Sequence, residues 1–302
     1  MKENISYQSY KTVDLKNGTY NGLDLNFKIK LNRDIAEMNA LPLVLPLTES
    51  ALSKIQVTAT LVGQTAHPTK IYNDLSLLDI INQKTSNAID YKSSIVGHKL
   101  MITNEESFVD VPVRLPFSPL QLNGKQMLQV EIKFNGFEFK TKDANDNIDL
   151  DKSFIEVTPS HTLSLQSDIE FIEKIQISDD KKKTYDFLQS VSKLAVIQSG
   201  DKPFDFDEAR CQSDIFNEDV NLANAITNTQ TNFAPNPTKD YLVLVSANTI
   251  PLNNLKVDLE RRNQQDTPME FLVSYLRKPS LVNNTNQTQR IVSRNERLKR
   301  LS

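Results

Sequence analysis

The chain has 302 residues, of which 38% are hydrophobic, and a formal net charge of −3 at pH 7. It contains one cysteine, Cys211, which excludes a disulfide framework within the chain. The absence of tryptophan and the presence of only seven glycines argue against a function built on glycine-rich phosphate loops. A chain of this length suits two domains of roughly 150 residues each.

The N-terminal sequence MKENISYQSYKTVDL has no apolar core, so it is not expected to be a signal peptide. The longest apolar stretch, LPLVLPL at 41–47, is too short to cross a bilayer and is interrupted by Pro42 and Pro46. We therefore expect a protein that is made in a cytoplasm and does not span a membrane, although it can contact one from the side.

Strict alternation of apolar and polar residues predicts half-buried β-strands in the first half of the chain. The clearest case is LDLNFKIKL at 23–31, and similar patterns follow at 55–61, 109–115 and 128–134. Pro112 within the third of these indicates an edge position or a bulge, because proline cannot donate to a central ladder. One helix is predicted at 75–91 from apolar residues at helical spacing.

The polar segment 141–153, TKDANDNIDLDKS, is the best candidate for a boundary because it lies near the midpoint and has few apolar residues. Alternating segments occur on both sides of it. The simplest architecture is all-β, with two tandem sandwiches at 1–150 and 151–302 and a few short helices in loops. The sandwiches are expected to be antiparallel, since the helical patterns do not alternate regularly with strands.

The second half repeats the strand pattern. Strands are predicted at 154–157, 162–166, 169–177, 241–245, 255–259 and 271–275. The segment 181–198 places Tyr185, Leu188, Val191 and Leu194 at helical spacing and predicts a helix. Residues 199–240 are interpreted as a long loop from the second sandwich, and the acidic stretch within it as a solvated loop.

Residues for catalysis are few. None of the three histidines, His67, His98 and His161, has a second histidine or a cysteine at metal-ligand spacing. A GxSxG elbow is missing, and the sequence lacks the tryptophan platforms that accompany paired carboxylates in glycosidases. The chain is therefore not expected to be an enzyme or to bind a cofactor. A β-sandwich hydrolase using acids such as Asp205 and Asp207 is the third-ranked function.

The acidic segment offers a weak metal site. Asp143, Asn145 and Asn147 follow the D-x-N-x-N spacing of calcium loops, and Asp149 lies close to them. The pattern then departs from an EF-hand, with Ile148 where glycine is needed and Phe154 where a bidentate glutamate is needed. Two interpretations stay open, a structural divalent ion held by these side chains and a solvated interdomain linker.

The C-terminal residues 281–302 carry a local charge of +4. Its basic residues are Arg290, Arg294, Arg297, Lys299 and Arg300, against Glu296 alone. Ile291, Leu298 and Leu301 recur at helical spacing, which would suit a short amphipathic helix on an anionic surface, and a disordered basic end is the alternative. The remaining body is acidic, so specific nucleic-acid binding is not expected.

Two β-sandwiches joined by a polar segment resemble the double jelly-roll major capsid proteins of tailless icosahedral bacteriophages that contain an internal membrane. In size the chain is similar to the compact type of corticovirus-like phages and of the lipid-containing single-stranded DNA phage of Flavobacterium. The segments that carry the resemblance are LDLNFKIKL, KIQVTATLV, MLQVEIKF and YLVLVSA, with the midpoint linker and the charged tail.

The resemblance implies two eight-stranded jelly rolls and a homotrimer that forms a pseudo-hexameric capsomer. Such capsomers would assemble into an icosahedral shell with neighbouring capsomers, a penton or spike protein and minor capsid proteins, so the protein would be located in the virion. The five basic tail residues would contact membrane lipids or a neighbouring capsomer. The alternative function is a carbohydrate- or receptor-binding β-sandwich of a phage spike or tail.

Overall fold

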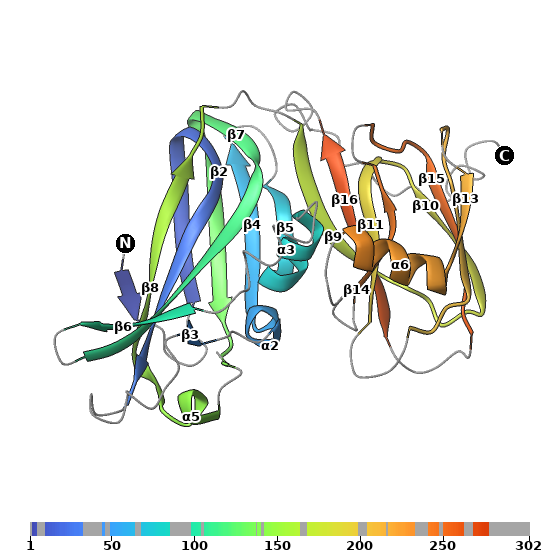
Figure 1. The fold of residues 1–302 in the computed structure, drawn as a ribbon. Coiled ribbons are helices and arrows are strands. Elements are labelled where there is room, and N and C mark those ends of the chain that lie inside the picture. Colours follow the sequence, from blue (N-terminus) through green and yellow to red (C-terminus); the bar gives the residue numbers. More distant parts are fainter. Residues whose placement is uncertain are drawn as a thin grey trace.

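The computed structural model consists of two β-rich bodies that lie side by side, the first holding strands β1–β8 and the second β9–β16 (Figure 1). The residues that it describes are 2–4, 10–32, 44–45, 49–63, 68–84, 98–103, 106–136, 138–139, 142–163, 168–198, 204–215, 217–232, 241–247, 250–262 and 268–277. The C-terminal tail, and with it Arg290, Arg294, Arg297, Lys299 and Arg300, lies outside them.

The first body contains eight strands among the described residues. They are β1 (Lys2–Asn4), β2 (Tyr10–Leu31), β3 (Val44–Leu45), β4 (Ile55–Gly63), β5 (Thr69–Ser76), β6 (His98–Thr103), β7 (Glu106–Phe134) and β8 (Ile148–His161). Its helices are α2 (Glu49–Ser53), α3 (Leu77–Lys84) and α5 (Lys142–Asn145). The predicted strands at 23–31, 55–61, 109–115 and 128–134 are therefore confirmed, and α3 confirms part of the helix predicted at 75–91.

Two long strands, β2 and β7, bend so that each contributes to both layers of the first body (Figure 1). They pair along nearly their whole length, and the pairing shifts register around Asn17 and Asn21. Such irregularities bend a strand. On one side of the bend β4 extends the sheet next to β7, and on the other side β8 extends it next to β2. Phe27 of β2 meets Phe134 of β7 across the layers, with ring centroids 5.8 Å apart.

Pro112 has β2 on one side, where it pairs with Asn26. On its other side β6 pairs with β7 only from Glu106 to Val109. Pro112 therefore lies beyond β6 at an edge position, as the sequence predicts.

The second body is a complete two-layer sandwich. Its strands are β9 (Ile169–Gln176), β10 (Lys182–Phe187), β11 (Ser190–Gln198), β12 (Glu208–Gln212), β13 (Asn217–Asn221), β14 (Tyr241–Ser246), β15 (Leu255–Glu260) and β16 (Met269–Arg277). One layer has the order β9-β16-β11-β14 and the other β10-β15-β12-β13. Successive strands alternate between the layers, apart from the hairpin β12–β13, and this connectivity is a jelly roll.

The layers of the second body meet through aromatic rings. Tyr185 and Phe187 of β10 contact the ring of Phe271 in β16 edge to face, with centroids 4.9 and 5.7 Å apart. Helix α6 (Leu222–Asn232) covers the outer edge of β14, where Thr229 Oγ1 accepts a hydrogen bond from the Val243 N–H at 2.9 Å. A covered edge cannot pair with a foreign strand.

Strand pairing favours a later division of the chain than the boundary predicted from the sequence. The boundary predicted at 150/151 lies inside β8, which pairs with β2 of the first body from Ile148 to His161. Strand β9 then begins the second body at Ile169. We therefore propose that the first jelly roll extends to His161 and that residues 162–168 connect the two. Of the strand predicted at 162–166, Thr162 and Leu163 are not in a strand, and the rest lies outside the described residues.

Two predictions for the second half were wrong. The helix predicted at 181–198 is the pair of strands β10 and β11. A β-bulge between Val191 and Lys193 and another next to Leu194 offset the alternation of β11, so that its buried residues imitate helical spacing. The long loop predicted at 199–240 holds β12, β13 and α6. In β12 the buried residues are Ala209 and Cys211, whose small side chains give a weak strand signal.

Candidate functional site

Helix α3 of the first jelly roll forms the joint between the two jelly rolls (Figure 1). It begins directly after β5, where Ser76 Oγ accepts a hydrogen bond from the Asp79 N–H at 3.0 Å and so caps the helix. Leu77, Ile80 and Ile81 are buried on its apolar side. The helix therefore presents its last turn, at Asn82 and Gln83, to the sheet of the second jelly roll.

Gln83 is the central polar contact of this joint. Its side-chain amide donates hydrogen bonds to the backbone carbonyls of Lys193 at 3.1 Å and Leu272 at 3.3 Å, which lie on β11 and β16. Its Oε1 accepts a hydrogen bond from the hydroxyl of Tyr241 on β14 at 3.0 Å. One buried side chain of the first jelly roll thus binds three strands of the second.

Lys193 of the second jelly roll contacts the end of α3 in the first. Its ammonium lies against the C-terminal end of α3 and donates to the carbonyl oxygens of Asn82 at 2.8 Å and Gln83 at 3.4 Å. The last carbonyls of a helix have no partners within it and carry partial negative charge. Lys193 therefore binds the end of α3 much as a capping residue would.

Burial governs the charge of this lysine. Lys193 is only 5% exposed. Loss of solvent lowers its pKa to about 7, while the carboxylate of Glu170 opposes that effect. Lys193 thus titrates near neutral pH inside the joint, rather than far above it as a surface lysine does.

Ion pairs and a strand contact complete the joint around this centre. Lys84 at the end of α3 pairs with Glu170 of β9 and bonds Ser118 of β7 at 3.2 Å, and Asp79 pairs with Lys174 of β9 at 2.8 Å. Strands β5 and β9 meet in a parallel pairing at Tyr72 and Ile172. These contacts hold the two jelly rolls as one body.

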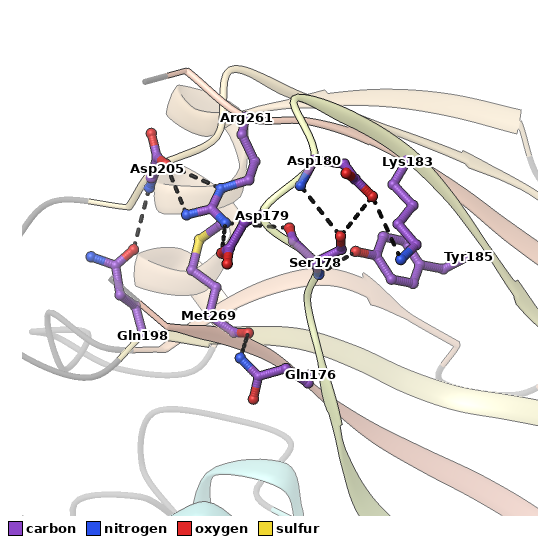
Figure 2. Close-up of polar contacts among 10 residues, drawn as sticks. All are labelled: Gln176, Ser178, Asp179, Asp180, Lys183, Tyr185, Gln198, Asp205, Arg261 and Met269. Atoms are coloured by element: carbon purple, nitrogen blue, oxygen red, sulfur yellow. Dashed lines mark hydrogen bonds and ion pairs between the residues drawn. The ribbon is translucent and has the colours of Figure 1, made fainter. Parts of the chain in front are cut away.

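A second buried polar cluster closes one end of the second jelly roll (Figure 2). Arg261 follows β15 and is 1% exposed. Its Nε donates to Asp205 Oδ2 at 3.1 Å, and its Nη1 donates to Asp179 Oδ1 at 2.7 Å and to the Ser178 carbonyl at 3.3 Å. Asp205 receives a further restraint because its N–H donates to Gln198 Oε1 at 3.3 Å.

This cluster, named here the Arg261 cluster, links the connections β9–β10, β11–β12 and β15–β16. Ser178 also donates its N–H to the hydroxyl of Tyr185 on β10 at 2.7 Å. The charges are paired and hydrogen-bonded, as buried charges must be. The geometry is that of a structural staple between loops, without a nucleophile next to a base.

The residues of the predicted metal site bind their own segment of the chain. Asn145 exchanges two hydrogen bonds of 2.7 Å with the backbone of Phe139, and Asn147 donates to the Asp143 carbonyl at 2.7 Å. Asp149 pairs with Lys152 at 3.1 Å, which lowers the pKa of its carboxyl. Among the described residues no group of three His, Cys, Asp or Glu side chains converges. The divalent ion stays a prediction.

The remaining candidates do not form a catalytic site in the described part of the chain. His161 lies at the end of β8 with its ring 4.7 Å from that of Tyr20. Cys211 is buried in β12, and burial raises the pKa of its thiol to about 12. Asp205 is taken up by Arg261, while Asp207 pairs with Arg262 at 2.7 Å on the surface. His67 lies outside the described residues.

The outer face of the sheet β10-β15-β12-β13 contains a depression of about 390 Å³. Its described lining residues are Lys182, Lys183, Thr184, Glu208, Arg210, Asp258, Leu259 and Glu260. Lys182 pairs there with Glu260 at 2.6 Å, and Thr184 donates to Asp258.

In the described residues, no helix has the length and apolar character needed to cross a membrane.

The connectivity and the joint define the class: the protein is all-β, with two tandem eight-stranded jelly rolls held together by a helix end. No protein-family model and no curated protein matches the sequence. Among solved structures, the STIV MCP (major capsid protein) matches 95% of this chain and 97% of its own, with a TM-score of 0.55 and 11% identity. The fold is therefore shared over nearly the whole chain.

A second match is the major capsid protein P2 from bacteriophage PM2, which covers 91% of this chain and 97% of its own with a TM-score of 0.40 and 12% identity. Both matched proteins are capsid proteins rather than enzymes. The resemblance noted in the sequence is thus matched by the shared fold of the first structure.

Proposed function

We propose that this protein is a major capsid protein that assembles into an icosahedral shell. The observation that carries the proposal is the tandem double jelly roll, shared with the STIV MCP over 95% of the chain. A shell subunit needs an extended, rigid body with large lateral surfaces rather than a reactive centre. The described residues fit that need, since buried polar groups such as Gln83, Lys193 and Arg261 serve structural contacts.

The assembly unit that we propose is a homotrimer. Three chains with two jelly rolls each place six similar bodies around a threefold axis, which gives a pseudo-hexameric capsomer. Closed cyclic symmetry is the usual form of a homo-oligomer. The joint supports this proposal because Gln83 and Lys193 fix the two jelly rolls relative to each other. Only a rigid subunit can make the same lateral contacts in every copy.

The proposed location is the virion, after synthesis in the host cytoplasm, with the shell surrounding an internal membrane. Partners would be neighbouring capsomers, a penton or spike protein, minor capsid proteins and the membrane lipids. The tail residues Arg290, Arg294, Arg297, Lys299 and Arg300 are proposed to contact the lipids or a neighbouring capsomer, because clustered basic residues bind anionic surfaces.

Electron microscopy of the purified protein and of its source particle tests this proposal. We expect capsomers with three-fold symmetry and pseudo-hexagonal outline, and closed shells when the protein is concentrated with its partners. Deletion of residues 289–302 is expected to preserve folding but reduce shell yield. An isolated chain attached to a tail or spike in the micrographs would contradict the proposal and support the receptor-binding alternative.

A further inference from the structure

The two jelly rolls meet through polar groups that gather around α3 (Figure 1). Gln83 binds backbone carbonyls of β11 and β16, and ion pairs run from the same helix to β9. Along the chain the two bodies are connected through residues 162–168. Domains whose contact is polar, rather than large and apolar, can move relative to each other. The joint is therefore where the two bodies can separate while each stays folded.

Lys193 is buried by this contact. The residue is 5% exposed, and its Nζ donates to the Asn82 carbonyl at 2.8 Å. Lys193 belongs to β11 of the second jelly roll, whereas Asn82 belongs to α3 of the first. Movement of α3 away from β11 would therefore expose the ammonium to water, while the strands of both bodies keep their pairing.

Ionisable groups face Lys193 from the elements packed around it. The ring of Tyr241 on β14 lies 5.7 Å from the ammonium, and the carboxylate of Glu170 on β9 favours the charged form of Lys193. Tyr72 of β5 stays neutral, because burial raises the pKa of its hydroxyl well above the ordinary value. The other charged groups around the joint form ion pairs, namely Lys84 with Glu170, and Lys174 with Asp79 and Glu270.

The protonation of Lys193 is linked to closure of the joint. In the closed joint, loss of solvent lowers the pKa of Lys193 to about 7, whereas an exposed lysine keeps the ordinary value of 10.5. Between these values the open joint binds a proton that the closed joint does not, so closure becomes more favourable as pH rises. The ratio of closed to open molecules should increase about 50-fold from pH 7 to pH 9. Below pH 7 Lys193 is charged in both states and adds little further pH dependence.

We propose that the joint is a pH-dependent hinge between the two jelly rolls. A neutral Lys193 keeps α3 against β11, and a proton on Lys193 favours an open arrangement in which α3 and β11 separate. The ligand that controls the hinge is the proton itself. The two bodies remain connected along the chain in both arrangements.

This inference goes beyond the proposed function, because it concerns a single chain and holds whether or not the chain forms a shell. In a shell subunit, the hinge would make the two jelly rolls one rigid body in mildly alkaline solution. Near neutral pH the two jelly rolls could adjust their relative position as lateral contacts form. The isolated chain suffices as the sample, so failure of the hinge and failure of shell assembly can be told apart.

Thiol labelling of the full chain measures opening of the joint. Ser274 of β16 is 0% exposed, and it points away from the side of Phe271, whose ring faces the interior of the sandwich. In Ser274→Cys, the introduced thiol therefore lies on the face that the first jelly roll covers, and it should react with N-ethylmaleimide when the joint opens. Its protection is measured relative to an exposed thiol in Gln121→Cys at the same pH. We expect this protection to rise about 50-fold from pH 7 to pH 9.

Two controls separate the hinge from general unfolding. The native Cys211 is buried in β12, in the other layer of the second jelly roll, so it should react far more slowly than the introduced thiol at both pH values. In the double variant Ser274→Cys with Lys193→Met, residue 193 cannot take up a proton. Protection of the introduced thiol should then be equal at pH 7 and pH 9.

Equal protection at both pH values in Ser274→Cys would overturn the inference, and so would an unchanged rise in the double variant. Equal rates at Cys211 and the introduced thiol would also overturn it, because exposure would then require unfolding of the second jelly roll. If Ser274→Cys lowers the Tm, the same measurement is made with Ile172→Cys. Ile172 is 2% exposed and pairs with Ser274 on the same face of the sheet.

Discussion

The two jelly rolls hold their layers together in different ways. In the first, β2 and β7 are continuous through the bend, so the chain itself joins the layers. In the second, eight short strands alternate between layers and depend on their connections. The Arg261 cluster ties three of those connections at one end. The comparison indicates that the first body is held by backbone pairing, whereas the second needs a buried side-chain network.

The joint between the two jelly rolls is held in a third way. It combines an apolar helix with a few buried polar contacts, centred on Gln83 and Lys193. Burial lowers the pKa of Lys193 to about 7, so at acid pH the joint must bury a charged ammonium, which is unfavourable. The relative position of the two jelly rolls should therefore respond to pH, while each body alone should respond less.

The largest effect is expected for Arg261→Ala in the second jelly roll. The substitution leaves the carboxylate of Asp205 buried without its partner, which should lower the free energy of unfolding by about 3–5 kcal/mol. Urea or thermal unfolding measures this loss. Arg262→Ala is the matched control, because Arg262 pairs with Asp207 on the surface and should cost about 1 kcal/mol or less.

The contrast can be sharpened with a paired substitution. Replacing both partners with apolar residues, Arg261→Met with Asp205→Leu, removes the buried charges together and should restore much of the stability. Equal losses from Arg261→Ala and Arg262→Ala would contradict the structural role given to the cluster.

At the joint, Gln83→Ala should lower stability by about 1–3 kcal/mol, because the backbone carbonyls of Lys193 and Leu272 lose a buried donor. Gln121→Ala, at an exposed position of β7, serves as the control and should be nearly neutral. Limited proteolysis should also cut the Gln83 variant faster within residues 162–168, between the bodies. No change in either measurement would show that the joint does not depend on this side chain.

Stability should rise with pH above neutral because of Lys193. Its folded pKa of about 7 lies below its ordinary value of 10.5, so between these values the unfolded chain binds a proton that the folded chain does not. The free energy of unfolding should then increase by up to about 1.4 kcal/mol per pH unit. Below pH 7 this contribution is lost, because Lys193 is charged in both states.

The substitution Lys193→Met measures the contribution of Lys193 to the pH dependence of stability. The variant should show a flatter dependence of unfolding free energy on pH between 7 and 10 than the parent chain. Glu170 and Tyr241 face Lys193, and Lys84 pairs with the same Glu170; all three are unchanged in both proteins. Parallel pH profiles for parent and variant would contradict the assignment.

The smallest effect is expected at the bend of β2. A Cβ added to Gly22 would lie 2.8 Å from the carbonyl oxygen of Leu115, so the paired backbones must move apart in Gly22→Ala. We expect a loss of about 1 kcal/mol, typical of overpacking. Gly63→Ala is the control, since its Cβ would meet only the side chain of Gln126 at 3.8 Å. A loss in the control as large as at Gly22 would argue against strain at the bend.

Much of the fold was predictable because half-buried strands leave a period of two. LDLNFKIKL buries Leu23, Leu25, Phe27, Ile29 and Leu31, as its alternation predicts. The pattern failed in β11, where bulges shift the alternation and α3 covers the outer face, and in β12, whose buried residues are small. The bend in β2 and β7 was not predicted, although Pro116 and Pro119 of β7 lie at the register shift opposite Tyr20 and Gly22.

The polar sites were less predictable than the strands. Asp205 and Arg261 are far apart in sequence and follow no spacing rule, so only the fold brings them together. Lys193 and Gln83 lie in segments whose pattern is dominated by apolar residues. The acidic segment had a recognisable spacing, yet Asn145 and Asn147 are used to bind their own loop. Sequence spacing shows which side chains could bind a metal ion, but the contacts that these side chains make depend on the fold.

Two jelly rolls fixed in one rigid body are proposed to form the subunit that self-assembles into the shell. Sedimentation velocity of the purified chain over a range of concentrations tests it most directly. We expect a stable trimer of the 34.3 kDa chain that associates further as concentration rises. A chain that stays monomeric at high concentration under all assembly conditions would contradict it.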